Sequence, residues 1–559
     1  MSNIDILTRH HAVAYAASEL DAANPSSGGM DSAMVAEILR SADRFSEDHL
    51  VALNQIGDRT GSILENGRVR TPPGHKQAWA EFQDGGWLKL DRKPDDGGMD
   101  LPLSLACCVQ EIMDRACPSF GMMPVPIRAA LRLIDAFGDN TIKDEWKAPL
   151  INGDWSTTIC ISEPDAGSDV RRIRTRAVKG EASKWHITGE KCWISFGDQD
   201  ITGRIGHCLL AKTEVNGNAD AISLFLVPDR FGETRNNIVV RRVEEKLGLH
   251  LSPTCALGFE GAEGFLLGEP GRGLQQLFVM IGQMRLATAV QGTGIAARAY
   301  NVARRYAGER RQGGNGETPV PIEEHADIQL MLLQMAARIE TLRGLTQAAA
   351  NALELADKSN NPDERQHNAA LAAWLLPIVK TMGGEAAFSC SSDAIQILGG
   401  AGYTKEWPVE QCLRDARVLT LFEGTTGMQA QDLLFRRLLG SNGTAYRAFL
   451  ATARQDQEGC DLLKDGLDTL EAVAAGLAAS EMTQQDQETG ATAFLALASA
   501  VAGGWIGARL AKQEESDPIA CHLAAAGEMA LYEMTNCLSN HAARALSRAP
   551  VIAKFGDIL

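Results

Sequence analysis

The sequence is poor in aromatic residues and has no cysteine pattern typical of a metal site or a disulfide framework. Aromatic residues make up 6% of the 559 residues, and the twelve cysteines include no Cys-x-x-Cys pair and no His placed to complete a zinc site. The first residues (MSNIDILTRHH) show no basic segment followed by an apolar one, so we expect no signal peptide. These absences exclude a small disulfide-stapled domain and favour a cytoplasmic protein with reduced thiols and no bound metal.

An excess of positive charge is also missing. The chain has 54 Lys and Arg against 71 Asp and Glu, a formal net charge of −17. This charge argues against a protein that coats nucleic acid or an anionic membrane. It leaves an anionic ligand open, because such a ligand needs only a local cluster of donors.

One stretch lacks charges altogether. The residues between Glu488 and Arg509 carry none, and the stretch is long enough to be considered as a membrane span. However, it consists mostly of Ala, Gly, Ser and Thr, with few large side chains. We therefore expect a buried helix of a bundle and no membrane association.

The length predicts about three or four domains at roughly 150 residues each. Hydrophobic periodicity predicts helices in residues 1–154, including Met34–Val51 and Leu103–Arg115. Alternating apolar and polar residues predict a β domain over 155–268. Helical spacing returns in 269–440, and 441–559 reads as a further helical extension. The expected fold class is mixed α and β in several domains.

Two glycine motifs imitate nucleotide-binding loops. Gly292-Thr293-Gly294-Ile295-Ala296-Ala297 fits G-x-G-x-x-[GA], but its flanks have helical periodicity where that motif needs a strand. We expect these glycines to permit close helix packing. Gly399-Gly400-Ala401-Gly402 lacks the Lys-Ser/Thr of a P-loop, and HExxH, G-x-S-x-G and kinase signatures are absent.

Three other stretches are candidates for a site, although each also fits an ordinary loop or strand. Residues 162–169 (SEPDAGSD) combine hydroxyls with a Gly where a ligand could touch backbone, and 191–195 (KCWIS) place a large aromatic beside a hydroxyl. Residues 422–427 (FEGTTG) hold a carboxylate between an aromatic residue and a Gly. Glu423 is therefore either a desolvated base or a solvated loop acid.

Taken together and in order, seven motifs resemble the acyl-CoA dehydrogenase family, and the resemblance covers the whole chain. They are CISEPDAGSDV, GEKCWISFG, EEKLGLHLSPTCALGF, LLGEPGRGL, AGERRQG, DAIQILGGAGY and WPVEQCLRDARVLTLFEGTT. The resemblance implies an N-terminal helical domain, a middle β-barrel-like domain and a C-terminal helical bundle, here with an extra helical domain. Residues 42–87 and 494–512 are similar to the branch typified by 3-methylmercaptopropionyl-CoA dehydrogenase, which degrades a dimethylsulfoniopropionate product in bacteria.

The resemblance implies FAD-dependent α,β-dehydrogenation of an acyl-CoA thioester, on 3-methylthiopropionyl-CoA or another short or medium acyl-CoA. By motif match Glu423 removes the α-proton while flavin N5 takes the β-hydride, and Gly424 lets the backbone approach the thioester. An electron-transfer flavoprotein is the implied electron acceptor. Because FAD in this family straddles two subunits, a homodimer is the minimum assembly.

The binding residues carry over by position. Ser162 and the backbone of Cys160 and Ile161 are expected at the flavin ring, with Trp193 and Ser195 flanking it. The substrate residues implied are Ser168, which also lies near the FAD phosphates, and Arg285 and Gly424. The remaining FAD contacts implied, several of them to the FAD of the neighbouring subunit, are Gly167, Ile194, Arg310, Gln396, Gly399, Gly400 and Thr425.

Some positions depart from the family pattern. Phe422 replaces a common Tyr, Gly427 a common Gln, and Gly282 an acidic residue that shorter relatives place near CoA. Two alternatives stay open: an oxidase, monooxygenase or lyase of the same fold, and a DNA-associated relative. Glu423 favours dehydrogenation, and the acidic tail, with 8 Lys and Arg against 15 Asp and Glu after Gly440, argues against DNA.

Overall fold

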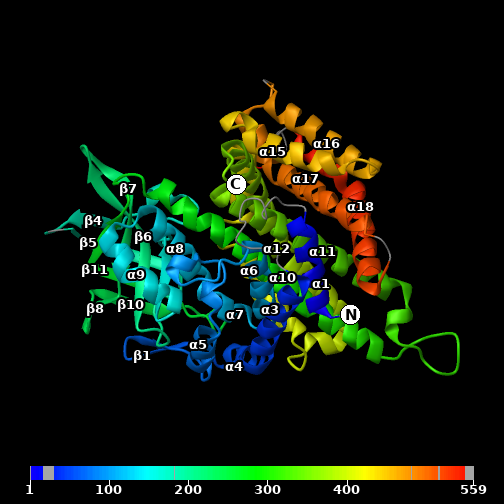
Figure 1. The fold of residues 1–559 in the computed structure, drawn as a ribbon, viewed down its shortest axis with the longest axis horizontal. Coiled ribbons are helices and arrows are strands. Elements are labelled where there is room, and N and C mark those ends of the chain that lie inside the picture. Colours follow the sequence, from blue (N-terminus) through cyan, green and yellow to red (C-terminus); the bar gives the residue numbers. More distant parts are fainter. Residues whose placement is uncertain are drawn as a thin grey trace. The chain divides into compact units, whose positions relative to one another are not determined.

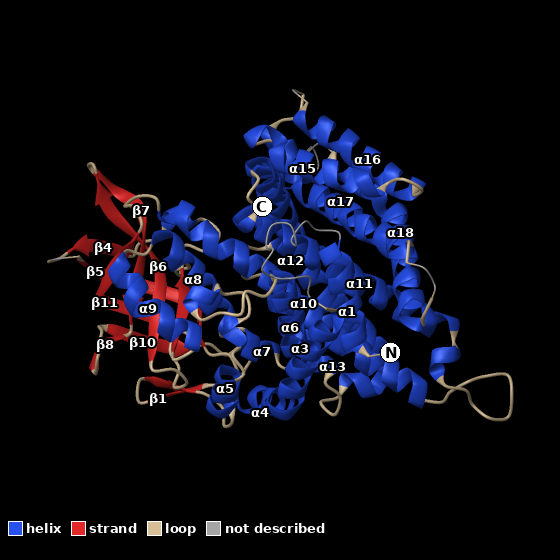
Figure 2. Ribbon diagram, in the orientation of Figure 1, coloured by secondary structure: helices blue, strands red, loops and turns tan. Residues whose placement is uncertain are grey.

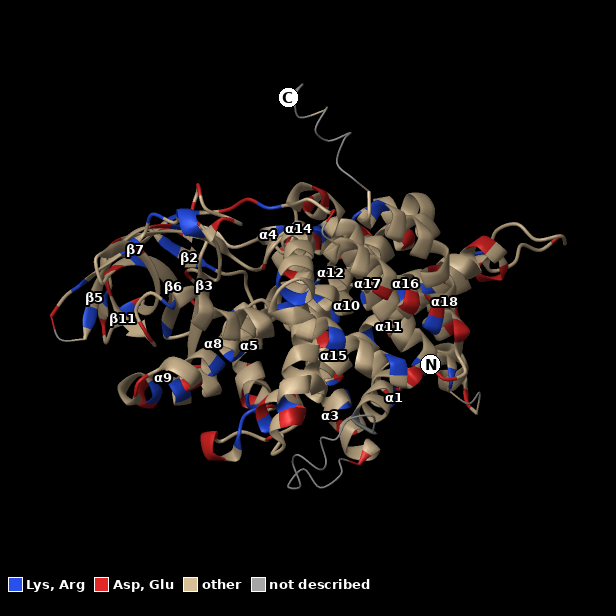
Figure 3. Cartoon of the chain, turned by 90° about the horizontal axis from the view of Figure 1, so that it is seen from above, with Lys and Arg blue, Asp and Glu red and all other residues tan. Residues whose placement is uncertain are grey.

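The structure is a computed structural model that describes residues 2–16, 31–181, 183–479, 481–513, 516–547 and Phe555. Its residues form two compact units. The first comprises Met1–Arg40, Leu103–Glu111 and Thr288–Leu559, and the second comprises Ser41–Pro102 and Ile112–Ala287. Strands of the main sheet occur in the second unit, and the first is built from helices (Figures 1 and 2). Acidic and basic residues are interspersed along both units (Figure 3).

A sheet that closes on itself forms the centre of the second unit. The strand order is β10-β11-β5-β4-β6-β3, and β7 pairs with both β6 and β11, so five of the strands form a ring. Its pairs are antiparallel except for β3 and β4, which each run parallel to β6. The strands are β3 (Trp155–Cys160), β4 (Arg176–Lys179), β5 (Lys184–Ser195), β6 (Arg204–Val215), β7 (Asn218–Pro228), β10 (Ile238–Val243) and β11 (Thr254–Leu267), with a small hairpin of β8 (Arg230–Phe231) and β9 (Thr234–Arg235).

Apolar side chains from alternate strand positions fill the ring. Ile187, Leu209, Phe225 and Leu257 are fully buried there. This burial explains the alternation that predicted a β domain. Helices α8 (Pro124–Phe137) and α9 (Asn140–Asn152) pack against β3, and Figure 1 shows both helices beside the sheet.

The helical part of this unit confirms the predicted helices with two differences. The run over Met34–Val51 is interrupted by a π-helical turn at Ser46–Leu50, and the sequence analysis missed a hairpin at residues 63–70. Asn66-Gly67, both with positive φ, makes the turn of that hairpin and was its sequence signal. The helices are α3 (Ser32–Phe45, which begins in the first unit), α4 (Val51–Thr60), α5 (His75–Asp84), α6 (Leu103–Ala116, shared between the units) and α7 (Pro118–Gly121), and the hairpin strands are β1 (Ile63–Glu65) and β2 (Arg68–Arg70).

Long helices form the core of the first unit. In α10 (Gly273–Glu309, whose residues up to Ala287 belong to the second unit) and α12 (Pro362–Leu398), Gly292 faces Gly383 so closely that a Cβ on Gly292 would lie 2.2 Å from the Gly383 carbonyl oxygen. The glycine motif therefore serves close helix packing, as predicted. The other helices are α1 (Asn3–Ala16), α11 (Ala326–Lys358), α13 (Val409–Ala416), α14 (Thr426–Gln431), α15 (Thr444–Ala453), α16 (Asp461–Ala478), α17 (Gln484–Ala511) and α18 (Pro518–Ala545).

The charge-free stretch lies in α17. By length and composition this helix passes the test for a membrane span, but 78% of its apolar window is buried inside the protein. It packs against α16, α18, α14 and α11. Burial on several sides is the property of a bundle core helix, which is what the small residues predicted.

Four helices of this unit meet at a buried charged cluster. Arg343 forms a bidentate ion pair with Glu111 of α6 and a second ion pair with Glu340 of α11, 3.0 Å between Nη1 and Oε1. Glu340 also accepts hydrogen bonds from His10 of α1 at 2.8 Å and His522 of α18 at 3.0 Å. The cluster thereby ties the first helix and the C-terminal extension to the central bundle.

Candidate active site

A bulge near the end of β5 turns Trp193 outward. The pairing register between β5 and β11 shifts there, so Cys192 and Trp193 both lie opposite Ala256, and Trp193 adopts φ 63°. Its side chain is 61% exposed, while the neighbouring Ile194 is buried. A large aromatic held in a left-handed conformation at a bulge indicates a functional position, because this backbone is costly for a residue with a Cβ.

The segment after β3 is fastened beside this bulge. The Cys192 N–H donates to the Ser162 carbonyl at 3.0 Å, so Ile161 and Ser162 lie next to the strand that carries Trp193 and Ser195. Cys160 is fully buried, and burial raises the pKa of its thiol to about 12. Only the backbone of Cys160 is therefore suited to a cofactor, and its expected contact with the flavin stays a prediction.

A buried ion pair between Lys191 and Glu163 holds the segment after β3 in place. The Lys191 ammonium donates to the Ile161 carbonyl at 3.0 Å and to Glu163 Oε1 at 2.7 Å. Glu163 also accepts from the Arg174 and Thr175 N–H groups. Burial opposes ionisation of Glu163, but Lys191 and these donors outweigh it and hold the pKa of this carboxyl below its usual range.

The loop after Glu163 is open. Gly167 and Ser168 are exposed, and a Cβ on Gly167 would have no atom within 4 Å. Arg285, the residue expected near CoA, is 8% exposed on α10 of the same unit. The second unit thus brings together an aromatic wall, hydroxyls and accessible backbone.

The Glu423 loop belongs to the first unit. Glu423 and Gly424 both have positive φ, 55° and 89°, between a 3₁₀ turn that ends at Thr420 and the start of α14. Glu423 is half-buried. The hydroxyl of Thr425 accepts from the Met428 N–H at 3.3 Å and caps α14. This cap fixes where the loop ends, and the expected contact of Thr425 with FAD stays a prediction.

Two side chains that the sequence analysis missed hold this loop. The Lys380 ammonium of α12, with no exposed surface, donates to the Gly424 carbonyl at 2.7 Å. The Gln429 amide donates to the Glu423 carbonyl at 3.0 Å and to the Gly424 carbonyl at 3.1 Å. A single Lys in the apolar run WLLPIVKTM was the available signal for the first of these.

The other expected FAD residues lie at the ends of α10 and α12. Arg310 follows the last residue of α10 and is exposed. Gln396, Gly399 and Gly400 are exposed at the end of α12, where a Cβ on either glycine would touch nothing within 4 Å. Accessible backbone and an exposed guanidinium suit a pyrophosphate brought by another molecule.

These features fit FAD. The exposed Trp193 indole provides an apolar face for a ring system, and the backbone of Ile161 and Ser162 provides polar groups beside it. Glu423, on the loop of the first unit, supplies a carboxylate that is able to accept a proton. Among the described residues, no group of three His, Cys, Asp or Glu is placed to hold a metal ion.

The chain belongs to the acyl-CoA dehydrogenase family, whose members are FAD-dependent oxidoreductases. Family models described as the N-terminal, middle and C-terminal domains of acyl-CoA dehydrogenase match residues 35–154, 158–262 and 271–438. The family, cofactor and fold expected from the seven motifs are thereby confirmed. The boundaries of the four-part division, including the extension from 441, stay a prediction.

Individual relatives are similar over most of the chain. It is 36% identical over 537 residues to 3-methylmercaptopropionyl-CoA dehydrogenase of Ruegeria pomeroyi, covering 90% of this chain and 91% of that protein. It is 31% identical over 433 residues to the broad-specificity linear acyl-CoA dehydrogenase FadE5 of Mycobacterium tuberculosis, covering 73% and 70%. The enzyme therefore acts on acyl-CoA thioesters as a dehydrogenase.

Solved structures share the fold. An acyl-CoA dehydrogenase complexed with FAD from Bacillus anthracis aligns over 95% of this chain and 91% of its own, with a TM-score of 0.75 and 20% identity. ACDH-11 of Caenorhabditis elegans in complex with C11-CoA aligns over 92% and 91%, with a TM-score of 0.76 and 20% identity. Coverage this high means that the C-terminal helices are part of the shared fold.

Proposed function

We propose that this enzyme oxidises 3-methylthiopropionyl-CoA to the corresponding 2-enoyl-CoA, with Glu423 as the catalytic base, as a step of dimethylsulfoniopropionate degradation. The observation that supports this substrate is the 36% identity, over nearly the whole of both chains, to a relative named for it. A carboxylate held on a strained loop between an aromatic residue and a glycine supports the role of Glu423.

The residues of the Glu423 loop have separate roles in the reaction. Glu423 accepts the α-proton of the thioester, so the carboxylate becomes a carboxylic acid as the α-carbon loses its proton. The backbone N–H of Glu423 donates a hydrogen bond to the thioester oxygen. Gly424 has no Cβ, so the loop backbone can approach the thioester closely. FAD, when bound, supplies the redox chemistry by accepting the β-hydride, which completes the C=C bond.

The same proposal includes the electron acceptor, the subunit assembly and the compartment of the enzyme. The electrons pass to an electron-transfer flavoprotein, and the active assembly is at least a homodimer, since Arg310 and the Gln396–Gly400 turn are exposed where they can serve a neighbouring subunit's FAD. The reaction takes place in the cytoplasm. All twelve cysteines are free thiols in the structure, which supports a reducing compartment.

Anaerobic mixing of the FAD-loaded enzyme with a panel of thioesters tests the substrate. The absorbance of the oxidised flavin at about 450 nm, a property of the cofactor, is followed after mixing with 3-methylthiopropionyl-, butyryl-, octanoyl- or 3-phenylpropanoyl-CoA. We expect the fastest bleaching with the first. Faster bleaching by another member would reassign the acyl group, and oxygen consumption matching product formation in air would replace the dehydrogenase by an oxidase or monooxygenase.

A further inference from the structure

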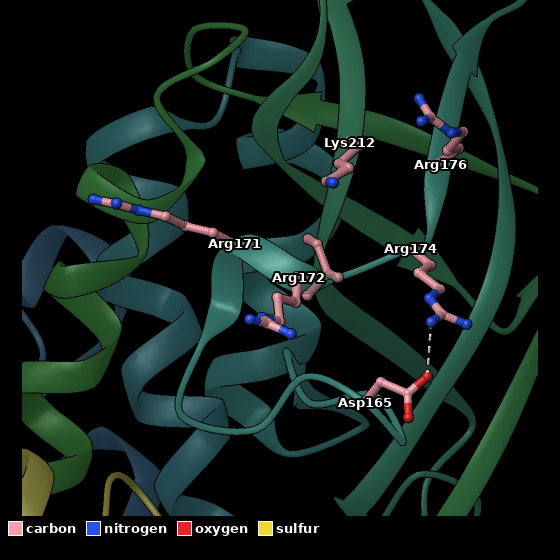
Figure 4. A pocket seen from close by; sticks show the side chains of 7 residues that line it. Asp165, Arg171, Arg172, Arg174, Arg176 and Lys212 are labelled. Carbon is pink, nitrogen blue, oxygen red and sulfur yellow. Dashed lines mark ion pairs between the residues drawn. The ribbon is translucent and has the colours of Figure 1, made fainter.

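Four arginines gather in a short stretch of the second unit. Arg171, Arg172, Arg174 and Arg176 directly follow the 162–169 loop, although the chain as a whole has a net charge of −17. Together with Lys212 and Asp165 they line a pocket of about 780 Å³ (Figure 4). A local concentration of positive charge on an acidic protein attracts an anionic ligand that the rest of the surface repels.

The arrangement is built by the fold. Arg176 of β4 and Lys212 of β6 are direct partners in the parallel register, and the Lys212 N–H donates to the Thr175 carbonyl at 2.8 Å. Ile173 is fully buried between the exposed arginines. Glu163 accepts from the backbone of Arg174 and Thr175, so the loop is fixed from its inner side.

Carboxylates neutralise this pocket only in part. Asp165 pairs with Arg174 at 3.0 Å, Asp169 with Arg172 at 2.9 Å, and Asp220 with Arg176 at 3.2 Å and with Lys212 at 3.4 Å. Five cations thus face three carboxylates, an excess of two positive charges.

The ion pairs are also weak. The side chains of Arg172 and Arg174 are 76% and 81% exposed, and ion pairs this exposed contribute about 1 kcal/mol or less. Arg171 extends away from Arg174 and Arg176 in Figure 4, and no carboxylate among the described residues forms an ion pair with it. A dianion can therefore exchange for Asp165 or Asp220 at little cost.

We propose that Arg172, Arg174, Arg176 and Lys212 bind the 3′-phosphate at the nucleotide end of the CoA thioester. This inference rests on the proposed function. A phosphate monoester carries up to two negative charges and three terminal oxygens, which match the excess charge and the several donors here. The exposure of the pocket suits the end of the ligand that stays near solvent, and the arginine forks give bidentate contacts that lysines alone do not.

Binding of CoA and 3′-dephospho-CoA to the FAD-loaded enzyme, measured by titration calorimetry, tests the pocket. The variants are Arg174→Gln and Lys212→Gln, and the matched control is Arg242→Gln, which removes a 60% exposed, ion-paired arginine from β10, separated from β4 by two strands. We expect each pocket variant to weaken CoA binding about fivefold, an effect that shrinks as salt is added. The affinity for 3′-dephospho-CoA and the whole control series should stay unchanged.

Several results would overturn the assignment. Equal losses for both ligands, or none, would place the 3′-phosphate elsewhere. Loss of FAD from the variants would assign the pocket to the cofactor, and a raised KM for the electron-transfer flavoprotein alone would assign it to an acidic protein surface. If no thioester bleaches the flavin while CoA binding still depends on Arg174 and the 3′-phosphate, the proposed activity fails and the pocket assignment stands.

Discussion

The Lys380 ammonium is wholly buried and is directed at the loop that carries Glu423. It donates to the Gly424 carbonyl, and the Gln429 side-chain amide donates to the carbonyls of Glu423 and Gly424. The costly positive φ of Glu423 persists because these donors hold the carbonyls of Glu423 and Gly424. Lys380 is therefore a positioning residue, acting on Glu423 through the backbone.

Replacing this lysine should slow chemistry more than binding. In Lys380→Met the loop loses its shortest hydrogen bond, and we expect the limiting rate of flavin reduction to fall about 10- to 100-fold because a displaced base is a poor one. The KM for the acyl-CoA should change little. The control Lys358→Met removes a lysine from the end of α11, 19% exposed and paired with Glu354. An unchanged limiting rate of flavin reduction in Lys380→Met would show that Lys380 does not position Glu423.

The Glu163–Lys191 pair should make the segment after β3 sensitive to acid. The pKa of Glu163 is lowered in the folded protein, so its contribution to stability is complete above its unfolded pKa and is lost as the pH falls through the folded pKa. In Glu163→Gln, we expect the unfolding free energy at pH 7 to fall by about 1–3 kcal/mol, because buried Lys191 loses its charged partner. Thermal unfolding from pH 7 to pH 3 measures this. The variant should lose less stability on acidification than the wild type, and parallel curves would contradict the assignment.

At the scale of elements, helix packing accounts for a glycine motif that imitates a dinucleotide site. Gly292 of α10 lies against the backbone of Gly383 of α12, where no side chain fits. Helical periodicity on both sides of the motif made this interpretation accessible from sequence. Which helix faces Gly292 was not accessible, because that partner lies about ninety residues further along the chain.

A methyl group should be enough to disturb this contact. Gly292→Ala places a Cβ 2.2 Å from the Gly383 carbonyl oxygen, so α10 and α12 must separate. We expect a net loss of about 1–3 kcal/mol in unfolding free energy, although alanine favours a helix more than glycine does. Gly316→Ala, whose Cβ would meet nothing within 4 Å, should change stability by less than about 0.5 kcal/mol. Equal melting temperatures for the two variants would show that the helices are not in close contact.

The elements and the parts of the site differ in how far sequence predicts them. Alternation and helical spacing predicted the β domain, α6 and the buried α17, because these patterns are local. The motif match named Glu423 and Trp193, but not that each has a positive φ, which depends on the bulge and on donors from distant helices. Lys191, Glu163, Lys380 and Gln429 were missed as supporting groups. Their partners are backbone groups and, for Lys191 and Glu163, each other's side chains 28 residues apart, which no sequence pattern records.

At the scale of the whole chain, the charged cluster around Arg343 links segments far apart in sequence. His10, Glu111, Glu340 and His522 come from four helices, and each lies within hydrogen-bonding distance of another member. Burial alone would lower the pKa of Arg343, but the two carboxylates outweigh it and keep the guanidinium charged. The C-terminal extension is thus fastened to the central bundle through a guanidinium that stays charged.

Removing that charge should loosen the extension. In Arg343→Met two carboxylates stay buried without their cation, and we expect a loss of about 3–5 kcal/mol in unfolding free energy. Arg338→Met on the same helix is the control, because its ion pairs, with Asp393 and with Glu533 of α18, are about 30% exposed and should each contribute about 1 kcal/mol or less. Limited proteolysis should release the C-terminal helices faster from Arg343→Met than from the control. Equal rates would show that the cluster does not fasten them.

The central claim is that Glu423 removes the α-proton of an acyl-CoA. Its most direct test is the rate of anaerobic flavin reduction by the best thioester in Glu423→Gln, beside Glu410→Gln, which replaces an ion-paired glutamate on α13. We predict that Glu423→Gln still binds FAD and reduces it about 100- to 10,000-fold more slowly, while Glu410→Gln matches the wild type. Flavin reduction at the wild-type rate in Glu423→Gln would contradict the account.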